Sequence, residues 1–236
     1  MKRTLKAKLA KLGYCYTLWQ CKKEYESQQF VGTNERPIEY GFIFRQLAQL
    51  CPRTILDVGT GTSALPHLMR TCGFLVTSTD NIRDYWPAGM VNRHFHVLND
   101  DITKTKLAQR FDVITCVSVL EHIKAHRAAV KSMFSLLNPR GHLLLTFPYN
   151  EGQYAENVYT LPDSEVKELP SFVTQAYSRH TVDTWLGENN GHIVEQEYWR
   201  LFTGKFWTCG ERIRPPVEVG RDDLHQISCI SFQRNQ

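Results

Sequence analysis

The sequence predicts an α/β fold in which strands alternate with helices. The first observation is an apolar segment, Ile55–Val58, followed by two closely spaced glycines, Gly59 and Gly61, and by Ser63, which can cap a helix. The second is that short apolar segments of strand length continue to alternate with helical segments toward the C-terminus. Because glycine has no Cβ and a helix start offers unpaired N–H groups, this strand, turn and helix suit a nucleotide-like ligand.

Apolar periodicity and the positions of glycine and proline predict the order of the elements. Helices are expected where apolar residues recur every three or four positions, and strands where they form short runs. Pro52, Gly73 and the turn over 138–141 mark boundaries. In chain order we expect a helix over 38–50, a strand over 55–58, a helix over 63–71, strands over 74–79, 95–98 and 111–117, a helix over 121–137, a strand over 142–147, a helix over 179–189, and strands over 192–199 and 226–232.

The composition is that of one globular domain with appendages. The chain has 236 residues, of which 42% are hydrophobic and 22% are charged, which is enough for one α/β domain and too few for two. It contains no run of 18 apolar residues and no apolar segment of a signal peptide, so we expect a cytoplasmic protein. Its seven cysteines include no C-x-x-C pair, which predicts neither a disulfide framework nor a zinc ribbon.

The pattern of lysines and apolar residues over 1–31 predicts a basic amphipathic helix, separate from a domain over 32–236. Its apolar residues recur at helical steps with lysines between them: Leu5, Leu9, Leu12, Tyr16 and Trp19. Such a helix either packs on its own domain or a second subunit, or contacts an anionic membrane or an acidic partner. The net charge of the chain is +4, and residues 1–23 alone carry +7, so the remaining residues carry −3. A nucleic-acid interface over the domain would need basic residues along its face, and we therefore expect no nucleic-acid partner.

The segment Leu56–Ser63, with the sequence LDVGTGTS, resembles motif I of the class I S-adenosylmethionine-dependent methyltransferases. The resemblance covers residues 53–147. Three further motifs follow in the family's order: an acidic end of the second strand at Asp80, an acidic turn over 99–102, and a strand over 111–114 leading into the sequence SVLEHI at 118–123. It implies a seven-stranded, doubly wound, Rossmann-like sheet with N-terminal helices and two insertions, at about 148–177 and 201–225.

The same glycine spacing also fits a dinucleotide-binding fingerprint. Gly59, Gly61 and Ala64 match its G/A form, and Asp80 follows at the distance of a ribose-binding carboxylate. Asp57 opposes this interpretation, because a carboxylate near the turn would repel a pyrophosphate and attract a cation. No tyrosine is followed four residues later by lysine, as a Tyr-x-x-x-Lys oxidoreductase requires. A NAD(P)-dependent oxidoreductase is therefore disfavoured, and a non-catalytic cofactor-binding module stays open.

The resemblance implies S-adenosylmethionine as the cofactor. It assigns the binding site to Asp57, Gly59, Thr60, Gly61, Ser63, Asp80, Asn81, Asp100, Asp101, Ile102, Ser118 and Val119. Asp80 closes the second strand, and ligands of open α/β sheets lie at the carboxyl ends of strands, so we expect Asp80 to bind both ribose hydroxyls. The resemblance gives the adenine amino group to Asp101, with Asp100 as the alternative, and places Ile102 against the ring.

Glu121 and His122 are the expected catalytic residues. They follow the fourth strand, which in the resembling family brings them beside the transferred methyl group. Imidazole, with an ordinary pKa of about 6.5, suits proton removal near neutral pH, although His122 could instead be a structural hydrogen-bonder. Some relatives hold a divalent metal with a Glu-x-x-Glu-His arrangement. Here Ser118 replaces the first glutamate, so we expect no metal and metal-independent transfer.

The acceptor is the least constrained part of the prediction. Adenine-specific amino methyltransferases resemble an Asn/Asp-Pro-Pro-Tyr/Phe motif after the fourth strand, where this chain has CVSVL at 116–120, so base methylation is unsupported. A loop as long as 148–177 is usually functional, and we expect an acceptor-binding lid there. The favoured hypothesis is O-methylation of a hydroxyl on a sugar, a glycan precursor or another small metabolite. N-methylation of a small molecule is the alternative, and the oligomeric state stays open.

Overall fold

The computed structural model describes residues 2–30, 32–86, 88–166 and 168–235, and the chain divides into two compact units, Met1–Glu35 and Arg36–Gln236. The first unit contains the helix α1 (Lys2–Glu26), and Leu9, Leu12 and Trp19 on it are exposed. Residue 31, where we placed the boundary, and the side chain of Leu5 lie outside the described residues. Among the helices of the described residues, none is both long enough and apolar enough to cross a membrane.

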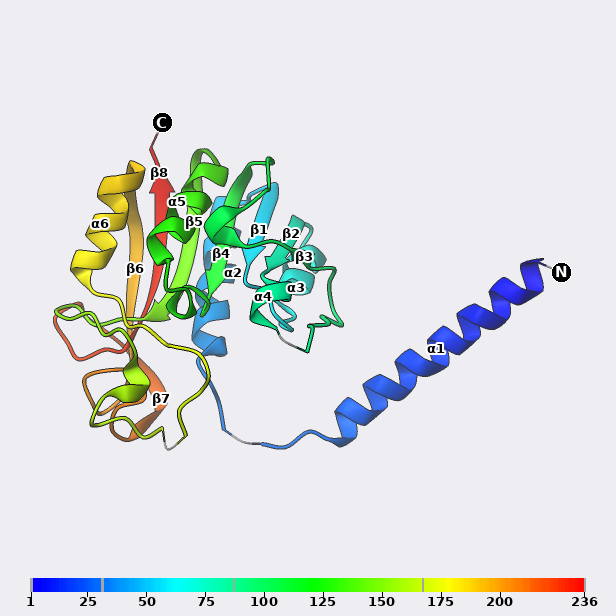
Figure 1. Cartoon of the computed structure of the whole chain (residues 1–236), viewed down its shortest axis with the longest axis horizontal. Coiled ribbons are helices and arrows are strands. Elements are labelled where there is room, and N and C mark those ends of the chain that lie inside the picture. The colour runs from blue at the N-terminus through cyan, green and yellow to red at the C-terminus, as the bar shows by residue number, and fades with distance from the viewer. Residues whose placement is uncertain (1, 31, 87, 167, 236) are drawn as a thin grey trace. The chain divides into compact units, whose positions relative to one another are not determined.

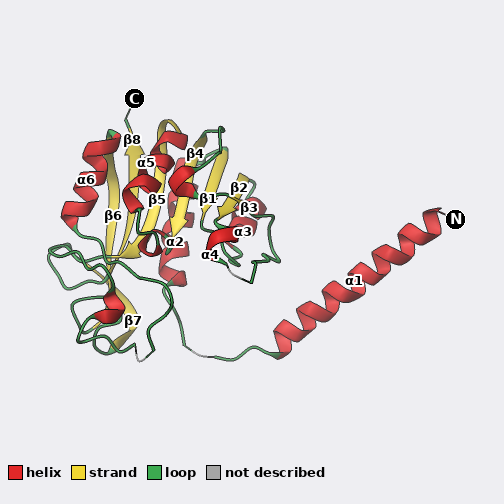
Figure 2. Cartoon of the chain, viewed as in Figure 1, coloured by secondary structure: helices red, strands yellow, loops and turns green. Residues whose placement is uncertain are grey.

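An eight-stranded sheet forms the centre of the second unit (Figures 1 and 2). The strand order is β3-β2-β1-β4-β5-β8-β6-β7. Strands β1 to β5 run parallel to one another, whereas β8 pairs antiparallel with both β5 and β6, and β7 pairs antiparallel with β6. The strands are β1 (Thr54–Val58), β2 (Leu75–Asp80), β3 (Leu98–Asn99), β4 (Phe111–Val117), β5 (Leu137–Pro148), β6 (Gly191–Phe202), β7 (Arg212–Val219) and β8 (Ile227–Arg234).

Helices cover both faces of the sheet, as Figure 2 shows. They are α2 (Arg36–Leu50), α3 (Leu65–Thr71), the short α4 (Ile82–Tyr85), α5 (His126–Leu136) and α6 (Arg179–Asn189). Because successive strand residues point to opposite faces, Ile55 packs in one apolar cluster with α2 and α3, and Leu56 packs in another with α5 and α6. The predicted doubly wound α/β fold is confirmed.

The strand count differs from the prediction because one strand lies inside the predicted second insertion. β7 pairs along β6, although it contains Pro215 and Pro216. Proline has no N–H to donate to a ladder, and it is tolerated here because β7 is an edge strand. The sequence did not predict this strand because two adjacent prolines are typical of a loop.

Other boundaries also differ from the prediction. α5 ends at Leu136 and β5 begins at Leu137, so the turn predicted over 138–141 lies within a strand. The third strand is limited to Leu98 and Asn99 instead of 95–98. The helix after β4 begins at His126 and not at 121, because Leu120–His122 forms a separate 3₁₀ turn. Glu121 and His122 therefore lie on a tight turn before the helix.

The two segments predicted as insertions pack against each other. Ala155, Val158 and Ala176 of the first share an apolar cluster with Phe206 and Cys209 of the second. The backbone N–H of Glu165 also donates to the carbonyl of Thr208 at 2.9 Å. The segment over 148–177 is therefore docked on a small core of its own.

Asp112 ties the amino-terminal end of β1 to β4 and β5. Its Oδ2 accepts hydrogen bonds from the backbone N–H groups of Arg53 and Thr54 at 3.0 and 2.9 Å and from the Thr54 hydroxyl at 3.0 Å. Its Oδ1 accepts one from Asn138 at 2.7 Å. Burial raises the pKa of Asp112, but these hydrogen bonds outweigh it and hold the pKa below its ordinary value.

Replacing this carboxylate should destabilise the fold. We expect Asp112→Ala to lower the free energy of unfolding by about 2 to 4 kcal/mol, because it leaves several donors without their acceptor. Since the pKa is lowered in the folded protein, the contribution should be present at neutral pH and lost as pH falls below about 4. Chemical denaturation at pH 7 and pH 3 measures both. The exposed Asp222→Ala is the control, and an equal effect of the two variants would contradict this role.

Candidate active site

The glycine turn after β1 is held in a conformation that only glycine adopts easily. Gly59 and Gly61 have φ angles of +72° and +53°, in the left-handed region. The N–H groups of Gly59 and Thr60 both donate to the carbonyl of Thr79 at the end of β2, at 2.8 and 3.1 Å. A Cβ on Gly59 would collide with the side chain of Val119. The turn is therefore in close contact with the segment that follows β4.

Asp57 lies buried beneath this turn. Its carboxylate accepts hydrogen bonds from Thr60 Oγ1 at 2.6 Å and from Thr115 Oγ1 of β4 at 2.7 Å. Burial raises the pKa of Asp57 to about 6, although the two hydroxyl groups partly oppose the rise. At pH 7 the carboxylate is largely ionised. It can therefore act on a bound cation through its field, without direct contact.

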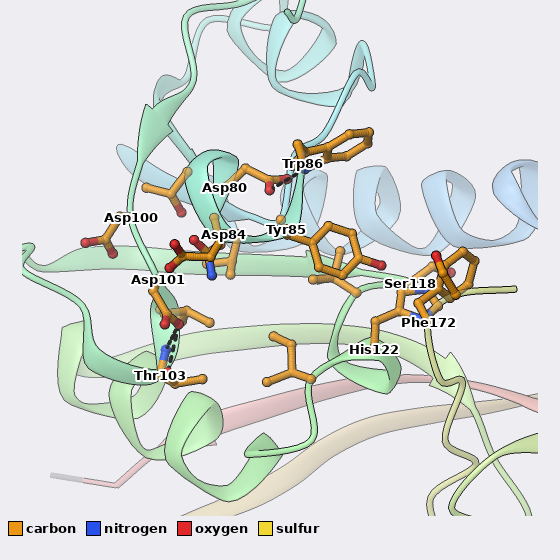
Figure 3. Close-up of a pocket in the computed structure, with 18 residues that line it drawn as sticks. Asp80, Asp84, Tyr85, Trp86, Asp100, Asp101, Thr103, Ser118, His122 and Phe172 are labelled. Carbon is orange, nitrogen blue, oxygen red and sulfur yellow. Dashed lines mark hydrogen bonds between the residues drawn. The ribbon is translucent and has the colours of Figure 1, made fainter. Parts of the chain in front are cut away.

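A cavity of about 760 Å³ opens beside the turn, at the carboxyl ends of β1, β2 and β4. Most of the predicted site residues line it: Gly59, Asp80, Asn81, Asp100, Asp101, Ile102, Ser118, Val119 and His122. The others lie around the turn or behind the wall: Asp57, Thr60, Gly61, Ser63 and Glu121. Figure 3 shows Asp100 and Asp101 at one end and Ser118, His122 and Phe172 at the other, with Tyr85 between them.

Asp80 lines the cavity at the end of β2 and is held at both carboxylate oxygens. The N–H of Gly61 donates to Oδ2 at 2.8 Å, and the indole N–H of Trp86 donates to Oδ1 at 2.9 Å. Each carboxylate oxygen accepts about two hydrogen bonds, so both oxygens retain capacity for a ligand hydroxyl. This fixed carboxylate fits a ribose with its two adjacent hydroxyl groups.

The end of the cavity near β3 provides further acceptors. Asp101 Oδ1 accepts from the N–H and hydroxyl of Thr103 at 2.9 and 2.7 Å, and thereby caps the 3₁₀ turn Ile102–Lys104. Asp100 Oδ1 accepts from the N–H of Lys106 at 3.0 Å, whereas its buried Oδ2 has no hydrogen-bond partner among the described residues. A buried oxygen of this kind needs a donor, and the amino group of an adenine fits that need. Asp100 and Asp101 both stay candidates.

His122 lies at the opposite end with one ring nitrogen engaged. Nδ1 is 2.8 Å from the carbonyl oxygen of Val173, so in the neutral ring Nδ1 carries the proton and Nε2 the lone pair. Burial lowers the pKa of His122 below its ordinary value of about 6.5; the Val173 carbonyl opposes this and the charge of Arg36 adds to it. His122 is therefore neutral at pH 7. Its ring meets Phe172 edge to face, with centroids 4.9 Å apart.

Glu121 and Ser118, two further predicted site residues, differ in their contacts. Glu121 is buried behind the cavity wall, with Oε1 4.0 Å from Nε2 of His122. Ser118 has a φ of +50°, and its hydroxyl donates to the buried carboxylate of Glu39 on α2. The Ser118 side chain is thus part of a structural contact.

Sequence reasoning missed four residues at this site. Tyr85, Trp86 and Phe172 line the cavity from segments predicted as loops. Glu39 also accepts hydrogen bonds from Thr146 and Arg36, both at 2.8 Å, and so joins α2 to the ends of β4 and β5. Only Glu39 had a sequence signal, since it is a charged residue beside the apolar stripe of a predicted helix.

Comparison with known proteins identifies the family. A family model described as a methyltransferase domain matches residues 30–196, most of the chain. The chain is a class I methyltransferase. The predicted family is confirmed, and with it S-adenosylmethionine as the cofactor.

Individual relatives are more distant. A ubiquinone biosynthesis O-methyltransferase from Psychrobacter arcticus is 31% identical over 176 residues, which is 67% of each chain. One from Coxiella burnetii is 28% identical over 136 residues, covering 55% of this chain and 56% of the relative. The chain thus spans little more than half the length of several such relatives. A solved 1,6-didemethyltoxoflavin-N1-methyltransferase from Burkholderia thailandensis shares the fold with a TM-score of 0.56 at 14% identity, covering 95% of this chain and 90% of its own.

Removing the central carboxylate should weaken cofactor binding. We expect Asp80→Ala to reduce affinity for S-adenosylmethionine by about ten- to a hundredfold, because charge-assisted hydrogen bonds contribute roughly 1.5 to 3 kcal/mol. Isothermal titration calorimetry measures the change, with Asp222→Ala as the control. Unchanged affinity would remove Asp80 from the cofactor site.

Trp86 should act on the cofactor through Asp80. Trp86→Phe keeps a ring near the glycine turn but removes the indole N–H that orients the carboxylate. We expect affinity for both S-adenosylmethionine and S-adenosylhomocysteine to fall about tenfold. The exposed Trp19→Phe on α1 is the matched control. Tighter binding by Trp86→Phe would instead show that the indole competes with the ribose for Asp80.

Proposed function

We propose that the protein transfers the methyl group of S-adenosylmethionine to a hydroxyl group of a small molecule. The observation that carries this proposal is the neutral His122 in the cavity wall, with its Nε2 lone pair not used by the Val173 contact. A hydroxyl must lose its proton when it is methylated, and a fixed imidazole nearby can take it. The similar proteins from Coxiella burnetii and Psychrobacter arcticus are named as O-methyltransferases, which supports the same chemistry.

The bound cofactor supplies an electrophilic methyl group on a positively charged sulfur. The protein's own residues then have three tasks. Asp80 and either Asp100 or Asp101 would hold the nucleoside, and the ionised Asp57 beneath the glycine turn would favour a positively charged ligand nearby. His122 receives the acceptor's proton at Nε2. Holding the reactants in place supplies much of the rate enhancement in such a transfer.

Glu121 supports His122 in this proposal. Its buried carboxylate oxygen lies 4.0 Å from Nε2, close enough to stabilise the positive charge that forms when the ring takes a proton. The ring keeps its orientation because the Val173 carbonyl holds Nδ1–H on the other side. Val173 belongs to the segment over 148–177, which we propose forms one wall of the acceptor site. Transfer in this scheme needs no metal ion.

The sequence favoured a sugar, a glycan precursor or another small metabolite as the hydroxyl acceptor, and of these classes the apolar ring of Phe172 in the cavity lining suits a small metabolite. A neutral amine can attack the methyl group before it loses a proton, so N-methylation would not need His122 as a base. No observation at the site favours it. The role of α1 stays a separate proposal. It either packs on protein or contacts an anionic membrane.

His122 should be needed for turnover and not for cofactor binding. We expect His122→Ala to lower the turnover rate by about 10² to 10⁴, the usual contribution of a general base, with unchanged affinity for S-adenosylmethionine. Transfer of a labelled methyl group into a cell extract measures the rate, and calorimetry measures the affinity. The exposed His94→Ala is the control. Near-normal turnover in His122→Ala would exclude the base.

The pH dependence should report the same group. Only the neutral imidazole accepts a proton, so activity should fall as pH decreases through the pKa of His122. Because burial lowers that pKa, the midpoint of the acidic limb should lie below about 6.5. The profile of kcat/KM measures it. An acidic limb that persists unchanged in His122→Ala would assign it to another residue.

A further inference from the structure

The cavity around His122 offers few polar partners to an acceptor. Among the described residues that line the cavity, Tyr85, Ser118 and Phe172 lie toward His122 in Figure 3, and Val119, Ile123 and Ser171 are neighbours of these residues in the sequence. The polar side-chain groups among these six residues are the hydroxyl groups of Tyr85, Ser118 and Ser171. The Ser118 hydroxyl already donates to Glu39. A sugar would bring several hydroxyl groups into this region, and each one left without a partner costs about 1 to 3 kcal/mol. An acceptor with one or two hydroxyl groups on an apolar ring fits better.

The charge of the cavity restricts the acceptor further. Among the described residues that line it are four aspartates and neither a lysine nor an arginine: Asp80, Asp84, Asp100 and Asp101. His122 is neutral at pH 7, so it adds no positive charge. At the end of the cavity near His122, the carboxylate of Glu121 lies 4.0 Å from Nε2, so an acceptor carrying a carboxylate or phosphate would meet like charge there as well. The acceptor's reacting part should therefore be uncharged.

The strength of the base separates phenols from alcohols. An imidazole whose pKa lies below its ordinary value is a weak acceptor for the proton of an alcohol, which is about as weak an acid as water. A phenol has a pKa of about 10, several units nearer. Efficient proton transfer requires donor and acceptor strengths that are not far apart.

Aromatic rings continue outward from His122 along both insertions. Phe172 meets Tyr159 with centroids 6.3 Å apart, and Tyr159 meets Trp207 at 6.0 Å. Phe172 is 38% exposed, so part of its ring is available for contact. Of these three rings Phe172 lines the cavity, and a planar acceptor can pack on its exposed part, while Tyr159 and Trp207 pack against the apolar cluster of the insertions.

We propose that the acceptor is an uncharged phenol whose ring packs on Phe172 and whose hydroxyl faces Nε2 of His122. This inference rests on the proposed function. The phenol oxygen forms a bond to the methyl carbon, the carbon–sulfur bond of the cofactor breaks with its electron pair left on sulfur, and the phenol proton goes to Nε2. The products are an aryl methyl ether and S-adenosylhomocysteine, and the proton is later released to water.

Three probe acceptors test the class with the full chain and labelled S-adenosylmethionine. 4-Methylcatechol is an uncharged phenol, 3,4-dihydroxybenzoate is the same ring with a carboxylate, and methyl α-glucoside is a sugar. We expect methyl transfer to 4-methylcatechol, kcat/KM lower by about a hundredfold for 3,4-dihydroxybenzoate because of the carboxylates in and behind the cavity wall, and no transfer to the glucoside. Saturation-transfer NMR with S-adenosylhomocysteine present measures binding of each probe independently of turnover.

Two variants localise the effect. Phe172→Leu keeps an apolar side chain but removes the ring, and should raise KM for 4-methylcatechol about tenfold with cofactor affinity unchanged. Ser171→Arg places a cation in the cavity lining. It should lower the ratio of kcat/KM for 4-methylcatechol to kcat/KM for 3,4-dihydroxybenzoate by about tenfold. Ser27→Arg, outside the methyltransferase domain, is the control.

The outcomes distinguish this inference from the function on which it rests. Transfer to the glucoside or to 3,4-dihydroxybenzoate in preference to 4-methylcatechol would overturn the inference and leave methyl transfer in place. Transfer into a cell extract without transfer to 4-methylcatechol would also overturn it. No transfer to any probe or into the extract, with the cofactor bound, would contradict the proposed function itself.

Discussion

The buried carboxylate of Asp57 is the interaction on which the site depends. It joins Thr60 of the glycine turn to Thr115 of β4 and so fixes the turn at the centre of the sheet. Burial raises its pKa to about 6, above the unfolded value of about 3.8. Its favourable contribution to stability is therefore complete below about pH 4 and is lost as pH rises through about 6. At neutral pH the protein keeps a buried negative charge at a cost in stability, and a positively charged cofactor beside the turn would benefit from it.

Contacts between distant segments determine the remaining geometry. Gly59 allows the turn to lie against Val119, which starts the segment carrying His122. The carbonyl of Val173 then sets which nitrogen of His122 carries the proton, and the neighbouring Phe172 packs on the same ring. A movement of the segment over 148–177 would therefore change the proposed base and the proposed acceptor wall together.

The sequence was sufficient for the features that depend on local patterns. The strand before Gly59, the position of Asp80 at the end of β2 and the helix over 179–189 follow from short-range periodicity and turn residues. β7 was missed because its two prolines are typical of a loop, and only pairing with β6 makes it a strand.

The site residues that were not predicted from the sequence depend on tertiary contacts. Trp86 and Phe172 lie in segments without periodicity, and only the fold brings them to one cavity. The lowered pKa of His122 likewise depends on burial, and the position of its proton on Nδ1 depends on Val173, 51 residues away in the chain. Residue types gave the candidates for the chemistry, whereas the partners of each side chain required the structure.

Carbon-13 NMR of the methylated product tests the central claim most directly. The full chain would be incubated with S-adenosylmethionine labelled at the methyl carbon and with an extract of cells, and the labelled product would be isolated. Transfer to oxygen predicts a methyl signal in the range of methyl ethers, whose protons show a three-bond correlation to a carbon of the acceptor. A labelled methyl signal in the range of methylamines, or labelled cofactor that is bound and never consumed, would contradict the account.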